Sequence, residues 1–267
     1  NTDKDALAIL KDAASKKLDP KSDQAKAVNV YKTYMDTISR NKLGIKPIKS
    51  TLAKIDAVKS IADLNKLIIE MQPQGGLGFY GIGIGPDAKN SNKNVVNIGL
   101  GSLGLPDRDY YVSEDADSKE KREKYVAHVA RMLQLIGDKP EVALANAKKV
   151  LAIEIAMATP RLDRVERRDR RKTYNPMSVA DLQKLTPSVN WDSYIKGVGI
   201  SKLDSVIVSQ PKYMTALETI FKENKVDEWK AYLRWSLLNK SSDVLTTDLE
   251  KANWDFYSKA LQGAKAQ

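Results

Sequence analysis

The sequence contains no cysteine, and it has one histidine, His128, among its 267 residues. The lack of cysteine excludes disulfide bonds, thiolate zinc sites and cysteine nucleophiles. A helical zinc site of the HExxH type requires two histidines one turn apart, so that both imidazoles reach one metal ion. A single histidine cannot supply that pair. We therefore expect no catalytic residue and no metal ligand in this chain.

His128 lies in the segment KYVAHVARMLQLI, beside a stripe of apolar residues at helical spacing. The stripe comprises Tyr125, Val129, Met132, Leu133 and Ile136. No G-x-S-x-G elbow or similar nucleophile motif accompanies the histidine. The pattern favours a packed, structural histidine over a catalytic one.

The sequence also lacks a long apolar run. No stretch approaches the ~18 consecutive apolar residues of a membrane span, and the polar first residues, NTDK, do not resemble a targeting segment. The net charge is +10, from 44 Lys and Arg against 34 Asp and Glu. This excess suggests nucleic acid, a membrane surface or an acidic substrate as partners. The acids are interleaved with the bases, however, which is more typical of a solvated helical surface.

Most of the chain has the apolar spacing of amphipathic helices, for example in residues 28–38, 64–71 and 214–221. From Gly75 a period of two replaces the helical period. Two alternating runs, residues 79–85 and 94–100, flank the turn-rich segment PDAKNSNKN and predict a β-hairpin with a longer loop. Residues 206–208 form a short β-like run.

No internal repeat, low-complexity tract or long linker divides the chain. The expected fold class is therefore mainly α, a multi-helix domain with a β-hairpin inserted at about residues 79–100. We expect one domain that spans residues 1–267.

Glycines at alternate positions leave one face of the first predicted strand bare. Another group can then approach the backbone closely, or a helix can pack there. Gly99, Gly101 and Gly104 also match the pattern G-x-G-x-x-G. We reject a dinucleotide site, because such a site needs a helix that opens at the third glycine within a βαβ unit. Leu105-Pro106 and a charged turn follow instead.

The segment RLDRVERRDRRK, residues 161–172, holds seven bases and three acids. A helix here would place Arg161, Arg164, Arg168 and Arg171 on one face, which is the strongest nucleic-acid signal in the chain. Acids nevertheless precede bases at i, i+4 spacing, Asp163 with Arg167 and Glu166 with Arg170, a pattern that stabilises solvated helices. The segment also lacks aromatics for base stacking. We therefore expect a salt-bridged helix, or a helix that faces an acidic surface of a partner domain, and consider nucleic acid unlikely.

Four segments resemble, in order, the N-terminal half of the neprilysin family of zinc metallopeptidases. They are YKTYMDTISRNKLGIKPI, GFYGIGIGPDAKNSNKNVVNIGLGSLGLPDRDYYV, RVERRDRRKTYNPMSVADLQKLTPSVNW and WDFYSKALQG. They are similar, respectively, to the family's early helix, its hairpin with the signature behind it, a later block, and the helix that leads back to the catalytic lobe. The absence of cysteine resembles the bacterial oligopeptidase type.

The resemblance implies the helical lid lobe of a zinc metalloendopeptidase, which encloses the active-site chamber and restricts substrates to peptides. In the family, the HExxH motif lies C-terminal to the equivalent of Gln267, so the catalytic zinc domain would be absent from this chain and the chain alone would be inactive. The expected partners are the catalytic lobe of the same protein, which would hold the zinc, and peptide substrates. A periplasmic or secreted bacterial location is also implied.

The resemblance further suggests contacts with the missing lobe or with the chamber wall. The candidate residues are Asp107, Arg108, Asp109, Tyr110, Tyr111, Arg164, Arg167 and Arg168. An equally strong alternative is that these residues form local salt bridges and caps that fix the exit of the hairpin. At the level of function, the alternative is a stand-alone helical module that binds peptides or proteins, and a basic nucleic-acid binder is third.

Overall fold

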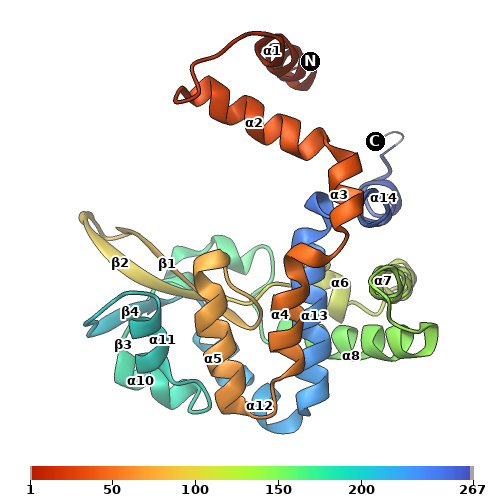
Figure 1. Cartoon of the computed structure of the whole chain (residues 1–267). Coiled ribbons are helices and arrows are strands. Elements are labelled where there is room, and N and C mark those ends of the chain that lie inside the picture. Colours follow the sequence, from red (N-terminus) through yellow and green to blue (C-terminus); the bar gives the residue numbers. More distant parts are fainter. Residues whose placement is uncertain (1, 265–267) are drawn as a thin grey trace.

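The structure, a computed structural model, describes residues 2–264 and is mainly α-helical (Figure 1). Residues 2–75 contain five α-helices: α1 (Thr2–Ser15), α2 (Asp23–Met35), α3 (Thr37–Leu43), α4 (Lys46–Asp56) and α5 (Ile61–Met71). Three more lie between the hairpin and the basic segment: α6 (Asp109–Val112), α7 (Ala116–Leu135) and α8 (Pro140–Ala158). The later helices are α9 (Arg170–Thr173), α10 (Val179–Leu185), α11 (Trp191–Gly197), α12 (Pro211–Glu223), α13 (Val226–Ser241) and α14 (Thr247–Trp254). The predicted fold class is confirmed.

A four-stranded sheet contains the predicted hairpin. Its strands are β1 (Tyr80–Asp87), β2 (Asn90–Leu100), β3 (Asn175–Ser178) and β4 (Ser205–Val208), in the order β1-β2-β4-β3. β1 and β2 are antiparallel, β2 and β4 are parallel, and β4 and β3 are antiparallel. The hairpin and the β-like run at residues 206–208 are confirmed. The longer loop is wrong, because β1 reaches Asp87 and β2 begins at Asn90, so that only residues 88–89 join the strands. Strand β3 was not predicted from the sequence.

Local signals set several helix ends. Ser60 caps α5, because its Oγ accepts the N–H of Asp63 (3.2 Å) while the Asp63 carboxylate accepts the N–H of Lys59 (3.0 Å). Pro140 occupies the first turn of α8, where its missing N–H costs no helical hydrogen bond. The starts of α5 and α8 are therefore set by residues at the helix ends themselves.

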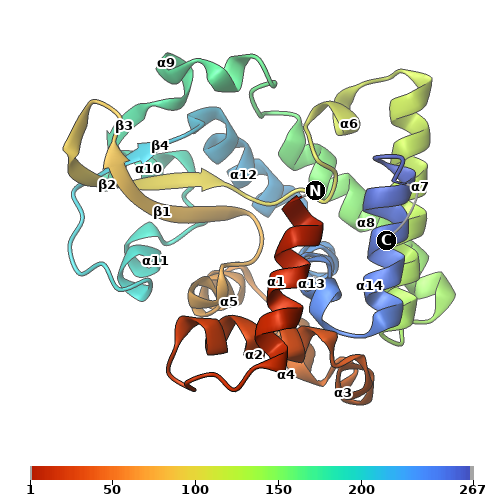
Figure 2. The same ribbon diagram turned by 90° about the horizontal axis from the view of Figure 1, so that it is seen from above.

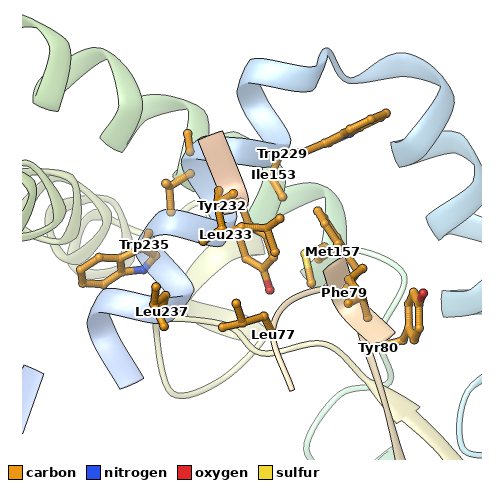
Figure 3. Close-up of a cluster of buried hydrophobic side chains, with 14 of the residues drawn as sticks. Leu77, Phe79, Tyr80, Ile153, Met157, Trp229, Tyr232, Leu233, Trp235 and Leu237 are labelled. Carbon is orange, nitrogen blue, oxygen red and sulfur yellow. The ribbon is translucent and has the colours of Figure 1, made fainter. Parts of the chain in front are cut away.

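The core joins the base of the hairpin to α8, α12 and α13 (Figure 3). Phe79 packs against Phe221 and Tyr232, with ring centroids 5.0 and 4.8 Å apart. The Tyr213 hydroxyl donates to the Phe79 carbonyl oxygen (2.6 Å). Helix α13 thus separates the sheet with α10 and α11 from α7, α8 and α14 on the opposite side (Figure 2).

Gly101 and Gly104 serve close packing at the end of β2. A Cβ on Gly101 would collide with the carbonyl oxygen of Gly78, and a Cβ on Gly104 would collide with the hydroxyl of Tyr125. No helix opens at Gly104, since the next helix is α6 at Asp109. Two of the three glycines of the G-x-G-x-x-G match, Gly101 and Gly104, therefore have a steric role, whereas a Cβ on Gly99 would meet no atom within 4 Å. The absence of a helix at Gly104 agrees with the rejection of a dinucleotide site.

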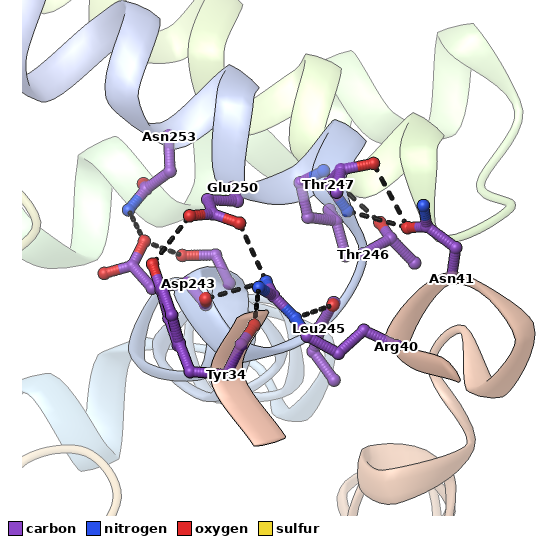
Figure 4. A network of polar contacts seen from close by, with 11 residues as sticks. Tyr34, Arg40, Asn41, Asp243, Leu245, Thr246, Thr247, Glu250 and Asn253 are labelled. Carbon is purple, nitrogen blue, oxygen red and sulfur yellow. Dashed lines mark hydrogen bonds and ion pairs between the residues drawn. The ribbon is translucent and has the colours of Figure 1, made fainter. Parts of the chain in front are cut away.

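The first helices form an arm that reaches away from the rest of the molecule (Figure 1). Arg40, in α3, ties this arm to the segment before α14 and to α14 itself (Figure 4). Its guanidinium donates to three carbonyl oxygens, those of Tyr34, Asp243 and Leu245, each at 2.9 Å, and to Glu250 Oε2 at 2.8 Å. Elements from the two ends of the chain are therefore fastened to each other.

The salt-bridged helix expected over the basic segment is wrong. Residues 161–165 are irregular, and helical turns cover Glu166–Arg168 and Arg170–Thr173. Asp163 Oδ1 accepts the N–H groups of Val165 (2.8 Å) and Glu166 (2.7 Å). This local turn competes with the helical hydrogen-bond ladder.

Candidate functional site

The structure brings together the two polar segments that the sequence singled out. Asp107, in the turn after the hairpin, accepts a hydrogen bond from Arg167 Nη2 at 2.9 Å, and Arg164 Nε lies 3.9 Å from the same carboxylate oxygen. The pairing that the sequence suggested for Arg167, with Asp163 on a helix, is replaced by this contact with Asp107. The basic segment is thereby held against the hairpin exit.

Tyr111 lies on the buried side of this turn. Its hydroxyl accepts the N–H of Leu105 (2.6 Å) and donates to Glu154 Oε2 (2.7 Å). Tyr125, from α7, donates to the same oxygen (2.8 Å), and the N–H of Gly104 donates to Glu154 Oε1 (3.1 Å). The Glu154 carboxylate of α8 thus connects three parts of the chain: the segment after β2, helix α6 and helix α7.

The other candidates are more exposed. Arg108 lies 3.3 Å from Asp109, its neighbour in sequence. Tyr110 contributes its carbonyl oxygen, which accepts from Arg122 Nη1 (2.9 Å), and its ring, which Lys121 approaches to 5.3 Å from the centroid. Within residues 2–264, the exposed side chain of Arg168 has no hydrogen-bond or ion-pair partner.

Glu154 was not among the candidates, and it is the most deeply buried acid of the site, with 1% of its surface exposed. Burial raises its pKa to about 7, although the hydrogen bonds from Tyr111, Tyr125 and Gly104 act in the opposite direction. It lines a cavity of about 390 Å³, together with Trp235 and Lys240. A signal was present in the sequence, because Ala147, Val150, Glu154 and Met157 recur at helical spacing on the buried face of α8.

His128 is confirmed as a packed histidine. Its ring stacks on Phe256, with centroids 4.5 Å apart, and meets Trp235 edge to face at 5.6 Å. Burial lowers its pKa to about 3, so the imidazole is neutral at physiological pH. In the part of the chain that the structure describes, no three His, Cys, Asp or Glu side chains are grouped as a metal site would require.

The two adjacent tyrosines give a matched test of the hairpin exit. Replacing Tyr111 with phenylalanine is expected to lower the free energy of unfolding by about 1–3 kcal/mol, because the buried N–H of Leu105 loses its acceptor and Glu154 loses a donor. Replacing Tyr110 with phenylalanine is expected to change it little. Denaturant unfolding of both variants checks this, and equal effects would contradict the role assigned to the Tyr111 hydroxyl.

Comparison with known proteins identifies the family. The N-terminal model of Peptidase family M13 matches residues 1–267. The chain therefore belongs to this family of metallopeptidases, the neprilysin family that its segments resemble.

Relatives and solved structures agree with this assignment. Endothelin-converting enzyme 1 of Cavia porcellus is 28% identical over 192 residues, which cover 70% of this chain and 25% of that protein. An endothelin-converting enzyme homolog of Locusta migratoria is 27% identical over 268 residues, 92% of this chain and 36% of that protein. The Mycobacterium tuberculosis zinc metalloprotease Zmp1 in its open state has a TM-score of 0.89 and 25% identity over 99% of this chain and 41% of that protein.

The fold is also that of PepO from Lactobacillus rhamnosis, with a TM-score of 0.85 at 18% identity. The chain spans about a quarter to two fifths of the length of these proteins. Among residues 2–264, no helix combines the length and apolar character needed to cross a membrane.

Proposed function

We propose that this chain is the non-catalytic lid lobe of an M13 zinc metalloendopeptidase. It encloses the active-site chamber and restricts substrates to peptides, while the catalytic lobe of the same protein holds the zinc and the residues that activate water. The observation that carries the proposal is the match of all 267 residues to the N-terminal family model in a sequence with one histidine. The structural neighbour Zmp1 is described as a zinc metalloprotease with an open state.

The surface of the arm supports a lobe that docks on another domain. Large apolar side chains are exposed along α1–α3, namely Leu7, Ile9, Val30, Tyr34, Met35, Ile38 and Leu43. An exposed apolar surface of this kind marks a contact with a partner. Because Arg40 fastens the arm beside α14, one end of the molecule presents both elements to the catalytic lobe.

We propose that the exposed arginines of the site, Arg164 and Arg168, contact the catalytic lobe or the chamber wall. Arg108, Asp109 and Tyr110 follow Asp107 after the hairpin, where Asp109 is exposed and the other two are partly exposed. We include these three residues in the contact surface. Asp107, Arg167 and Tyr111 hold that surface in place through the bonds described above. For the parent enzyme we propose a periplasmic or extracellular location in a bacterium, on the resemblance to the bacterial oligopeptidases.

The first expected outcome concerns activity. The purified chain with added Zn²⁺ is expected to cleave no internally quenched peptide at a rate that a chelator abolishes, because one histidine cannot provide the zinc ligands. Mixing the chain with the HExxH-containing half of the parent enzyme is expected to restore cleavage. Chelator-sensitive cleavage by the chain alone would refute a non-catalytic role.

Two variants of the arm refine this reconstitution. Ile38 is 82% exposed, so replacing it with aspartate is expected to abolish reconstitution without changing the melting temperature of the chain. Replacing the exposed Gln24 of α2 with aspartate adds the same charge at a polar position and is the matched control. Equal reconstitution by both variants would show that the arm is not the docking surface.

A further inference from the structure

The outer edge of β1 carries backbone groups without partners. β1 ends the sheet and pairs with β2 alone. The N–H of Ser209 donates to the carbonyl oxygen of Ile98 (3.0 Å), so the backbone groups of Ile98 face β4. In an antiparallel pair, the residue opposite such a position also points its N–H and C=O away from the partner strand. That residue is Ile82, and by alternation Ile84 does the same.

Proline occurs where this geometry predicts. Pro86 shares the phase of Ile82 and Ile84, so its missing N–H falls on the outer edge and costs no bond to β2. In residues 2–264, no group outside the β1–β2 pair forms a hydrogen bond with the N–H or C=O of Ile82 or Ile84. The edge therefore offers donors and acceptors that alternate at the spacing of a strand.

The glycine face of β1 is empty. A Cβ added to Gly81, Gly83 or Gly85 would meet no atom within 4 Å. Of the two alternatives for this face, the packed helix is therefore wrong. The φ angles of these glycines are not positive, so their backbone does not require glycine. Bulky side chains of an added strand can cover glycines on an edge strand.

The opposite face of β1 borders an apolar hollow. Ile82 and Ile84 line a hollow of about 280 Å³ together with Pro73, Val198 and Ile200. Ile84 is 66% exposed there. At the hairpin end of the strand, Lys89 and Lys93 outnumber Asp87, which favours an acidic group on whatever lies along this edge.

We propose that the free edge of β1 binds an extended peptide by strand addition. The main chain of the peptide bonds to Ile82 and Ile84, its apolar or aromatic side chains alternate between the hollow and the glycine face, and an acidic residue lies near the hairpin tip. The inference rests on the proposed lid function, because the peptide is then a substrate held inside the chamber. The inference specifies that this substrate is extended, with alternating apolar or aromatic side chains and an acidic residue near the hairpin tip.

A peptide with selective N-methylation tests the hydrogen bonds. The probe is a fluorescein-labelled octapeptide with Phe and Leu alternating with Thr and with one terminal Glu, titrated with the full chain by fluorescence anisotropy. N-methylation at one alternating set of residues is expected to weaken binding at least about tenfold, because those N–H groups face β1, while the other set changes it less than about twofold. Equal effects of the two sets, or no binding of the unmethylated peptide, would overturn the proposal.

A change in the protein locates the site. Replacing Ile84 with proline removes an outward N–H without touching the bonds to β2 and is expected to weaken binding about tenfold. Replacing Ile84 with valine keeps the N–H and the branched side chain and is the matched control, with binding within about twofold. Unchanged affinity of Ile84→Pro would overturn strand addition at β1; if this variant misfolds, the methylated peptides still decide. Reconstitution of peptidase activity tests the lid function separately, so the two proposals can fail independently.

Discussion

Replacing Glu154 with alanine is expected to lower the free energy of unfolding by about 3–5 kcal/mol. The change leaves the Tyr111 hydroxyl, the Tyr125 hydroxyl and the Gly104 N–H without their acceptor. Each buried donor that loses its hydrogen-bond partner costs about 1–3 kcal/mol. Replacing Glu141 with alanine is the matched control, because Glu141 is the same residue type, exposed in the first turn of the same helix. Its effect is expected to be close to zero in the same denaturant titration.

The pH dependence of stability identifies the same carboxyl group. Burial raises the pKa of Glu154 from its ordinary value of 4.5 to about 7, so between these values the folded state binds the proton that the unfolded state has lost. Its contribution to stability is therefore fully present below about pH 4.5, decreases as the pH rises toward 7, and is constant above. The expected loss is about 3 kcal/mol.

The measurement is the difference between wild type and Glu154→Gln, because the other titrating groups cancel in that difference. As the pH rises from about 5 to 7, the free energy of unfolding of the wild type should decrease relative to that of Glu154→Gln. Parallel stability profiles of the two proteins from pH 4 to pH 8 would show that Glu154 does not titrate in this range.

Replacing Arg40 with methionine is expected to release the arm. Arg40 is 8% exposed, donates four hydrogen bonds, and lies over the ring of Tyr34, whose hydroxyl bonds the same Glu250 (2.6 Å). Breaking a buried ion pair by removing one partner costs about 3–5 kcal/mol. The cost falls on the attachment of α3 to α14, since the contacts of α8 and α13 with the core remain.

Hydrogen exchange followed by mass spectrometry distinguishes this local release from global unfolding. Peptides from α2 and α3 should lose protection in Arg40→Met, whereas peptides from α8 and α13 should keep it. Lys26→Met is the matched control, because Lys26 forms an exposed pair with Asp23 on α2 and its loss should leave every peptide unchanged. A uniform loss of protection in Arg40→Met would mean that Arg40 supports the whole fold.

Local patterns were sufficient to predict much of the fold. The alternation in residues 79–100, with its glycines and turn residues, predicts the hairpin, because both strands are set by neighbours in sequence. Strand β3 could not be predicted in the same way. It is four residues long, contains Pro176, and exists because it pairs with β4. Its stability comes from a distant segment and leaves no periodicity to detect.

In the candidate site too, local features could be predicted from the sequence and contacts between distant segments could not. The charges of Asp107 and of the basic segment are visible in the sequence, but the i, i+4 pairing predicted for Asp163 and Arg167 is wrong. Asp163 bonds its own following N–H groups, and Arg167 pairs with Asp107 across 60 residues. Tertiary contacts therefore override a helical pattern whose pairs each contribute only about 0.2–0.5 kcal/mol. Glu154 was detectable, because an acid on the buried face of a helix requires partners.

The parallel pairing of β2 with β4 has a consequence for the order of folding. β1 and β2 are joined by a short turn and can pair as soon as residues 80–100 are available. Asn97 and Ile98 can pair only after Ile207 and Val208 have been synthesised, and helices α6 to α11 lie between the two segments in the chain. The entropy of closing that loop has to be overcome before the pairing is gained. The β4 side of β2 is therefore the strand edge that stays open longest on a nascent chain, and the surface on which a folding intermediate would aggregate.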